Sequence, residues 1–155
     1  MRRKDKEITD KKIIEEILSK SVLCRIAMID DGRPYIVPLN YGYFNNELYF
    51  HSALTGKKIE LLKLNKNVCF EIEYSTEIIK ADVSCKWSMR YRSLIGYGTI
   101  EIIENNDQKR HGLDIIMAQN GKSLNNIYEE KQVNNLLILK LKIDEISCKQ
   151  SGNWN

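Results

Sequence analysis

Long hydrophobic runs are absent from this sequence. No stretch approaches the roughly 18 apolar residues that a transmembrane helix needs, so we expect no membrane-spanning segment and no membrane partner. The first ten residues, MRRKDKEITD, are basic, but no apolar stretch follows them. A secretory signal requires such a stretch, and its absence here favours a cytoplasmic protein.

An excess of charge of one sign is also lacking. The 24 Lys and Arg residues are nearly balanced by 21 Asp and Glu residues, and the formal net charge is only +3. Because the basic residues are scattered among acidic ones, the sequence offers no extended basic surface. We therefore expect no nucleic-acid partner, while a local basic pocket for a small anion stays open.

Cysteine occurs four times but never as a C-x-x-C pair. Zinc sites usually draw on such closely spaced ligands, so we expect no metal site. Two of the cysteines lie inside apolar runs that are typical of strands. This placement favours buried thiols in a reducing compartment.

Neither an internal repeat nor a proline-rich linker divides the chain. Its 155 residues, of which 43% are hydrophobic and 29% charged, suit one domain with its own core. We expect residues 1–155 to form this single domain, with 1–8 and 148–155 as flexible or peripheral tails.

Runs of alternating or continuous apolar residues predict mainly β-structure with a few helices. Most connections are too short for parallel crossovers, so the sheet should be mainly antiparallel. About six such strands with flanking helices suggest a small barrel that removes most of its own edges. Strands are expected over 22–29, 33–44, 47–52, 67–74, 90–103 and 136–147, and helices over 9–20, from residue 57 onward, and in part over 108–121.

Three local signals refine this prediction. Pro38 inside a strand indicates an edge or a bulge, because proline has no N–H to donate to a neighbouring strand. Asn45 and Asn46 can adopt the positive φ angles of a tight hairpin turn. Gly96 and Gly98 inside one long strand suggest a bulge, a barrel corner, or the close approach of a ligand.

The stretch LYFHSALTGKKIELLKLN, residues 48–65, gathers polar groups where a predicted strand leads into a predicted helix. A helix N-terminus has unpaired N–H groups and a partial positive charge, which favour a phosphate. Solvated lysines with no ligand are the alternative. The stretch does not match the P-loop pattern, so a nucleoside-triphosphate site is not indicated. The groups that would surround a phosphate are Ser52, Thr55, Gly56, Lys57 and Lys58.

Two longer segments carry a family resemblance. GRPYIVPLNYGYFNNELYFHSALTGKKIELLKLNKNVCFEI and YRSLIGYGTIEII resemble the pyridoxamine 5'-phosphate oxidase-like, FMN-binding split barrels, and most of all the nitroimidazole-resistance (Nim) branch. The resemblance extends over roughly residues 8–104. It implies non-covalent FMN and a homodimer with two flavin sites at the interface. The tail CKQSGNWN lacks the Arg and His of the founding oxidases, so oxidation of pyridoxamine phosphate is not expected.

The resemblance also implies roles for particular residues. The strand VPLNY would run beside the isoalloxazine ring, and the HS and TGKK pieces would hold the phosphate, with Ser52 and either Lys57 or Lys58 as direct ligands. Trp154 lies on a tail that either folds over the site or is disordered. The further residues placed near the flavin are Pro38, Leu39, Asn40, Arg92 and Ser93.

His51 is the candidate catalytic residue. A histidine here is characteristic of the Nim branch, and its titration range allows proton transfer or hydrogen bonding to a substrate. The alternative is a histidine that only makes a structural hydrogen bond at the end of a strand.

Two functional hypotheses follow. The first is an FMN-dependent oxidoreductase that reduces a small molecule, which the Nim likeness suggests is a nitroaromatic, with a reduced nicotinamide or another reductase as donor. The second is a flavin- or haem-binding module without turnover of its own, in which His51 would be an axial haem ligand. A barrel that has lost its cofactor is a third reading.

Overall fold

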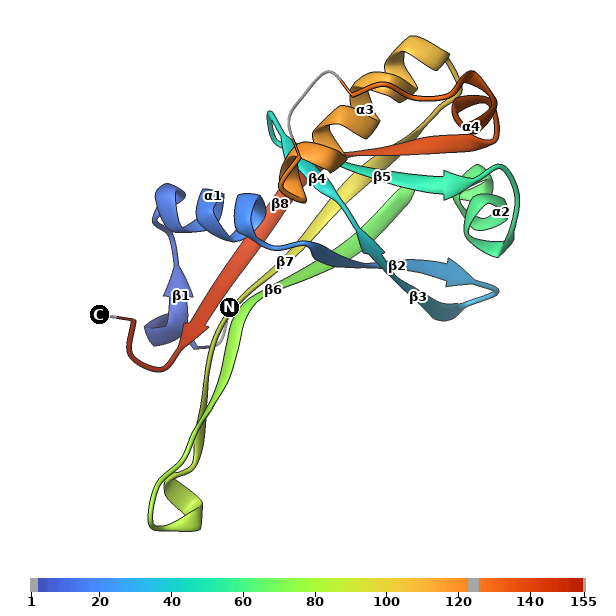
Figure 1. Ribbon diagram of the computed structural model, residues 1–155. Helices are drawn as coiled ribbons and strands as arrows, with labels where there is room; N and C mark the ends of the chain where they lie inside the picture. The colour runs from blue at the N-terminus through green and yellow to red at the C-terminus, as the bar shows by residue number, and fades with distance from the viewer. Residues whose placement is uncertain (1–2, 123–125, 155) are drawn as a thin grey trace.

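The structure, a computed structural model, describes residues 3–122 and 126–154 and is built around one antiparallel sheet with short helices on its faces (Figure 1). The predicted class, mainly β with flanking helices, is confirmed. In chain order the elements are η1 (Lys4–Lys6), β1 (Glu7–Ile8), α1 (Lys11–Lys20), β2 (Leu23–Asp30), β3 (Arg33–Asn40), β4 (Gly42–Phe44), β5 (Glu47–Ala53), α2 (Lys57–Leu64), β6 (Asn67–Ile79), η2 (Ser84–Lys86), β7 (Ser88–Ile103), α3 (Asn106–Gln119), α4 (Glu130–Asn134) and β8 (Leu136–Ser151).

The sheet follows the order β3-β2-β6-β7-β8-β5-β4, with β1 paired to the far end of β8. Every pairing in it is antiparallel, as expected from the short connections. The sheet does not close: β3 and β4 are its two edges. The expected barrel is therefore split, and Pro38 lies on an edge strand, where a missing N–H is tolerated.

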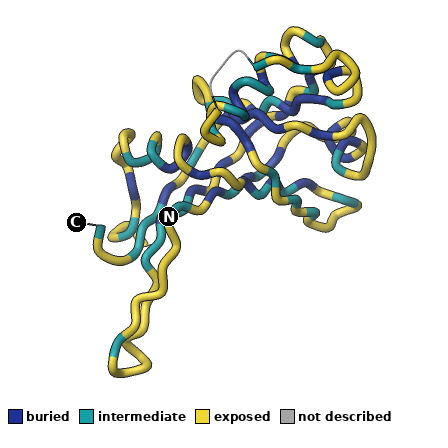
Figure 2. Tube along the Cα trace, in the orientation of Figure 1, coloured by how far each residue is buried: buried dark blue, intermediate teal, exposed yellow. Residues whose placement is uncertain are grey.

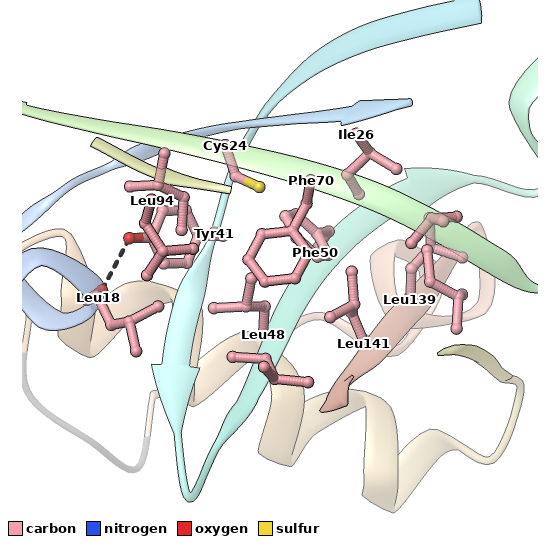
Figure 3. Packing of buried hydrophobic residues seen from close by; sticks show 14 of the residues in the cluster. Leu18, Cys24, Ile26, Tyr41, Leu48, Phe50, Phe70, Leu94, Leu139 and Leu141 are labelled. Atoms are coloured by element: carbon pink, nitrogen blue, oxygen red, sulfur yellow. Dashed lines mark hydrogen bonds between the residues drawn. The ribbon is translucent and has the colours of Figure 1, made fainter. Parts of the chain in front are cut away.

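One residue separates the two edge strands along the chain. The single strand predicted over 33–44 is in fact β3 and β4, which pair with different neighbours and are divided at Tyr41. The Tyr41 side chain is fully buried, and its hydroxyl donates a hydrogen bond of 2.7 Å to the carbonyl oxygen of Leu18 in α1 (Figure 3). This bond fixes the crossing segment to the helix beside it.

The main core fills the space enclosed by the curved sheet (Figure 3). Helix α1 begins at Asp10, whose side chain accepts a hydrogen bond from the Lys12 N–H, and buries Ile17 and Leu18. Helix α2 adds its own apolar face. The largest fully buried side chains are Tyr41, Phe50, Phe70, Ile17, Leu18, Ile26, Leu48, Ile59, Leu62, Ile72, Leu94 and Ile100.

The strand glycines serve packing inside the protein. A Cβ on Gly96 would lie 2.4 Å from the Phe70 ring, so only glycine at this position leaves room for the Phe70 side chain against β7. The register of β7 against β8 shifts between Tyr97 and Gly98, which confirms the bulge suggested by the sequence. The Gly96 requirement therefore comes from a core phenylalanine.

Both ends of the chain take part in the sheet. Strand β8 continues to Ser151, and Ile8 of β1 pairs with Cys148 inside this extension. Both Ile8 and Cys148 are buried. The segment 148–151, expected to be part of a tail, is thus part of a strand, because β1 and β7 cover it on both sides.

The helices within the described ranges are all too short or too polar to cross a membrane.

We predict that Tyr41→Phe lowers the free energy of unfolding by about 1 kcal/mol, because a buried hydrogen bond to the Leu18 carbonyl is lost. Chemical denaturation measures the change. Tyr43→Phe is the matched control: its hydroxyl donates to Glu15 at the surface, and its loss should cost about 0.5 kcal/mol or less. Equal losses for the two variants would contradict the role of Tyr41.

Candidate functional site

The turn between β5 and α2 brings five of the predicted residues together. Ser52, near the end of β5, is buried, and Thr55 and Gly56 lie exposed in the turn. Gly56 has φ 121° and ψ 167°, a conformation that is essentially restricted to glycine, and a Cβ there would meet no atom within 4 Å. The glycine therefore serves the backbone path and leaves open space beside it.

Helix α2 presents its N-terminus at this turn. The Gly56 carbonyl accepts hydrogen bonds from the Ile59 N–H at 2.9 Å and the Glu60 N–H at 3.1 Å. Glycine has no side chain, and in the described structure nothing else supplies a side-chain cap to the first turn. Ile59, Leu61 and Leu62 are buried and hold the helix against the barrel. The result is a fixed helix start with partial positive charge and N–H groups available to an anion.

The two lysines differ in their surroundings. Lys57 Nζ lies 2.7 Å from Asp30 Oδ1 at the end of β2, and this hydrogen bond raises the pKa of Lys57 above its ordinary value. Lys58 is half-buried, and burial lowers the pKa of its ammonium group. Across the described ranges, no carboxylate lies within ion-pair distance of Lys58. A partly desolvated cation without a counter-ion is the group at this turn best suited to an anionic ligand.

His51 and Ser52 are neighbours on β5 but face opposite sides of the sheet. His51 is exposed, whereas Ser52 is buried on the side that carries Phe50 and the main core. One ligand can therefore meet both side chains only by reaching around the end of the strand.

Arg92 and Trp154 form a second group on the other end of the sheet. Only 8% of Arg92 is exposed, and its guanidinium bonds to Glu16 at 3.0 Å and to Gln150 at 3.3 Å. The Trp154 ring covers it, with 4.1 Å between the guanidinium carbon and the ring centroid. Trp154 thus folds back over the neighbouring strand β7, where a second arginine, Arg90, also faces the ring at 5.3 Å.

The two groups are far apart in one chain. Ser52 pairs with Leu137 of β8, whereas Arg92 pairs with Gln150 of the same strand. Roughly 40 Å of strand separates these two positions at about 3.3 Å per residue. A single flavin cannot touch both groups of one protomer.

The remaining predicted residues lie on the free edge of the sheet and beside the second group. Pro38 and Asn40 are exposed on β3, and Leu39 between them packs against the core. Ser93 is half-buried on β7 next to Arg92. An edge strand offers unpaired backbone groups along its outer side, as contact with the rim of a flat ring requires.

Sequence reasoning missed the partners of the charged residues. It did not find Asp30 beside Lys57 or Glu16 beside Arg92, because the members of these pairs are 27 and 76 residues apart in the sequence. Nothing in the local pattern marks either acid as a partner. Only the packing of α2 beside the end of β2, and of α1 beside β7, brings each pair together.

A match to a protein-family model establishes the family to which this chain belongs. Residues 10–150 match the model described as pyridoxamine 5'-phosphate oxidase. The chain belongs to the pyridoxamine 5'-phosphate oxidase family. The resemblance inferred from the VPLNY and HSALTGKK motifs is thereby confirmed.

Several solved structures are similar to this chain over most of its length. A candidate 5-nitroimidazole antibiotic resistance protein from Bacteroides thetaiotaomicron is 36% identical, with a TM-score of 0.82 over 93% of this chain and 86% of that one. An FAD and haem binding protein from Mycobacterium smegmatis is 25% identical, with a TM-score of 0.81 over 96% of this chain and 75% of that one. The flavocytochrome Anf3 from Azotobacter vinelandii, 18% identical with a TM-score of 0.82 over 99% of this chain and 72% of that one, shares the fold.

A curated relative from Rhizobium meliloti (strain 1021), an uncharacterized protein, is 36% identical over 56 residues. The match spans 36% of each chain, so it concerns about a third of either protein.

We predict that Gly56→Ala lowers the free energy of unfolding by about 2 kcal/mol, because alanine is strained at φ 121° and ψ 167°. Gly32→Ala is the control: its φ of 75° is in a milder left-handed region and its surroundings are equally open, so the cost should be about 1 kcal/mol. Urea denaturation of both variants tests this order. A Gly56→Ala variant as stable as the parent would show that the turn is not constrained.

Proposed function

We propose that the protein binds FMN non-covalently and acts as a reductase of a small oxidised molecule. The observation that carries this proposal is Lys58: a half-buried lysine that makes no ion pair with any described residue, in the first turn of a helix whose N-cap glycine offers no side-chain cap. Family membership supports a flavin as the ligand, as do relatives whose names state FAD, or FAD and haem, as what they bind.

The turn residues would hold the phosphate. Ser52, Thr55, Lys58 and the N–H groups that begin α2 all belong to one strand-to-helix connection, from which they could surround a phosphate. Lys57, already bonded to Asp30, would contribute charge at longer range and brace the turn against β2. Gly56 would let the phosphate approach the backbone, because no atom occupies the space beside its Cα.

The edge strand β3 would line the ring. Backbone groups near Pro38, Leu39 and Asn40 would contact the rim of the isoalloxazine, which supplies the hydride and electron chemistry when it is bound. His51, exposed on β5, would donate a hydrogen bond or a proton to the substrate. These roles are part of the proposal.

A homodimer would bring the two separated groups to one flavin. Since roughly 40 Å of strand separates them within a protomer, Arg92, Ser93 and Trp154 would contribute to the site of the partner copy. A two-fold axis makes such an exchange occur twice, which gives two flavin sites per dimer.

The experiment that tests the function has two stages. The visible absorption spectrum of the purified protein, reconstituted with FMN, should show flavin bands that persist through gel filtration. Anaerobic mixing with a reduced nicotinamide should then bleach these bands, and adding a nitroaromatic compound should restore them. Bound flavin that no donor bleaches would mean a binding module without turnover, and a protein that retains no flavin would refute the proposal.

Haem is the second candidate ligand, and exposed His51 is the observation that favours it. The relative from Mycobacterium smegmatis is named for both FAD and haem. A Soret band after reconstitution with haem, lost in His51→Ala, would support this alternative, whereas FMN binding in the same variant should persist.

We predict that Lys58→Ala weakens FMN binding on the order of 10-fold or more, because a charge-assisted hydrogen bond to the phosphate is lost. Lys57→Ala is the matched control, and we expect a change of about 3-fold or less because its ammonium group is already bonded to Asp30. Fluorescence titration with FMN and with riboflavin measures both.

Riboflavin lacks the phosphate, so its affinity should be equal in the parent and in Lys58→Ala. Equal loss of FMN affinity in the two lysine variants would show that the ion pair with Asp30 does not distinguish them. A parallel loss of riboflavin affinity would place Lys58 at the ring instead of the phosphate.

A further inference from the structure

Residues 75–90 project from the body of the protein as a long two-stranded ribbon, here called the arm (Figure 1). It consists of the distal parts of β6 and β7 with η2 at the tip, and its residues are mostly exposed (Figure 2). A two-stranded ribbon is only marginally stable by itself in water. The arm therefore lacks the packing that holds the rest of the sheet.

The two faces of the arm differ. Ile78 is directly opposite Met89, and their side chains are 59% and 46% exposed on one face. Glu77 is directly opposite Arg90, and the two form an ion pair on the other face. The ion-pair face also carries Ile79, which is 38% exposed, so the Ile78–Met89 face is the more apolar of the two, and it meets solvent.

The tip adds a half-exposed tryptophan. Trp87 Nε1 donates a hydrogen bond of 2.7 Å to the carbonyl oxygen of Ala81, which fixes the indole against the turn. Trp87 as a whole is nevertheless 50% exposed, and Lys80 Nζ lies 6.0 Å from the centroid of its ring. The tip thus presents a held aromatic ring beside a cation.

An apolar groove lies at the other end of the same strands. It has a volume of about 450 Å³ and is lined by residues of β2, the start of β3, the start of β6, β7 and β8. Glu145 lies in a hollow that adjoins it at Tyr97. The lining residues that matter here are Ala27, Ile29, Pro34, Cys69, Tyr97 and Asp144.

The arm cannot reach the groove of its own chain. Strand β7 begins at Ser88 near the tip and runs continuously to Tyr97 in the groove. Roughly 30 Å of strand lies between them at about 3.3 Å per residue. Any arm that fills the groove must come from another molecule.

We propose that the arm of one copy of this chain packs into the groove of a second copy. Trp87 and Met89 would fill the groove. Lys80 lies near the indole and Lys86 precedes Trp87 in the sequence, and these two lysines would face the acidic residues Asp144 and Glu145 at the rim of the groove. Both surfaces are exposed, apolar and complementary in charge, and one chain carries both. A two-fold axis repeats the contact, so neither arm nor groove is left uncovered.

The contact needs no flavin. It can be tested on the apoprotein. A dimer that forms without the arm–groove contact would overturn this inference and leave the proposed cofactor site intact, whereas a monomeric parent would also remove the partner's contribution to that site. An arm that packs on the partner's arm, or on a different protein, is an alternative that the test must separate.

Cys85 at the tip of the arm provides a direct test, because it is exposed while Cys24 and Cys148 are buried. A photoreactive maleimide on Cys85 should yield, on irradiation, a covalent dimer of the 18.1 kDa chain. Mass spectrometry should map the attached peptides to residues 27–34, 67–69 or 97–98. The Cys85→Ser variant is the control for label on half-buried Cys69. Cross-links from arm to arm, or none between copies, would overturn the proposal.

Substitutions on both sides provide the second test. Trp87→Ser and Tyr97→Ser should each weaken self-association about 30-fold or more in sedimentation velocity, as loss of a central aromatic contact does. Ile127→Ser is the matched control: Ile127 is 99% exposed and lies outside both surfaces, so its loss should change the affinity less than 2-fold.

Charge reversal separates a direct contact from local damage to the arm. Lys86→Glu and Asp144→Lys should each weaken association, and the double variant should recover most of the loss. An additive double variant, or a parent protein that is monomeric, would refute the arm–groove contact.

Discussion

The fold depends on how the chain crosses the opening between the two edges of its sheet. Tyr41 makes this crossing alone, because β3 ends at Asn40 and β4 begins at Gly42. Burying the Tyr41 ring requires a partner for its hydroxyl, and the Leu18 carbonyl supplies it. A Cβ on Gly42 would come within 2.5 Å of the backbone of α3, so the chain has little freedom on either side of the crossing.

This crossing leaves the sheet split, and the split has consequences for the site. The edge strand β3 keeps unpaired backbone groups on its outer side, which a closed barrel would not have. The path through β4 and β5 then delivers the chain to the start of α2. There, burial of the helix's apolar face holds Lys58 partly out of water, with no counter-ion among the residues that the structure describes. An anion therefore gains more from this position than from a solvated lysine.

Much of this was predictable from local pattern. The positive φ angles of Asn45 and Asn46 and the bulge beside Gly98 follow from residue chemistry, and the structure has both of them. The VPLNY and HSALTGKK motifs together identified the family, because their combination is specific although neither is specific alone. The division at Tyr41 was missed because a buried crossing residue looks like any strand tyrosine. The arm was missed because its apolar residues, such as the adjacent Ile78 and Ile79, do not alternate as they do in a half-buried strand.

The sequence by itself determined the strand and helix content, the family, and which residue types gather at the β5–α2 turn, because these depend on near neighbours in the chain. Only the tertiary structure decided that Lys57 is bonded to Asp30 while Lys58 is not, and that Arg92 and Trp154 form a separate group. It also decided that an arm and a groove face solvent on one molecule. The reason is that charge pairing, burial and reach are set by segments distant in sequence, whose meeting no local pattern encodes.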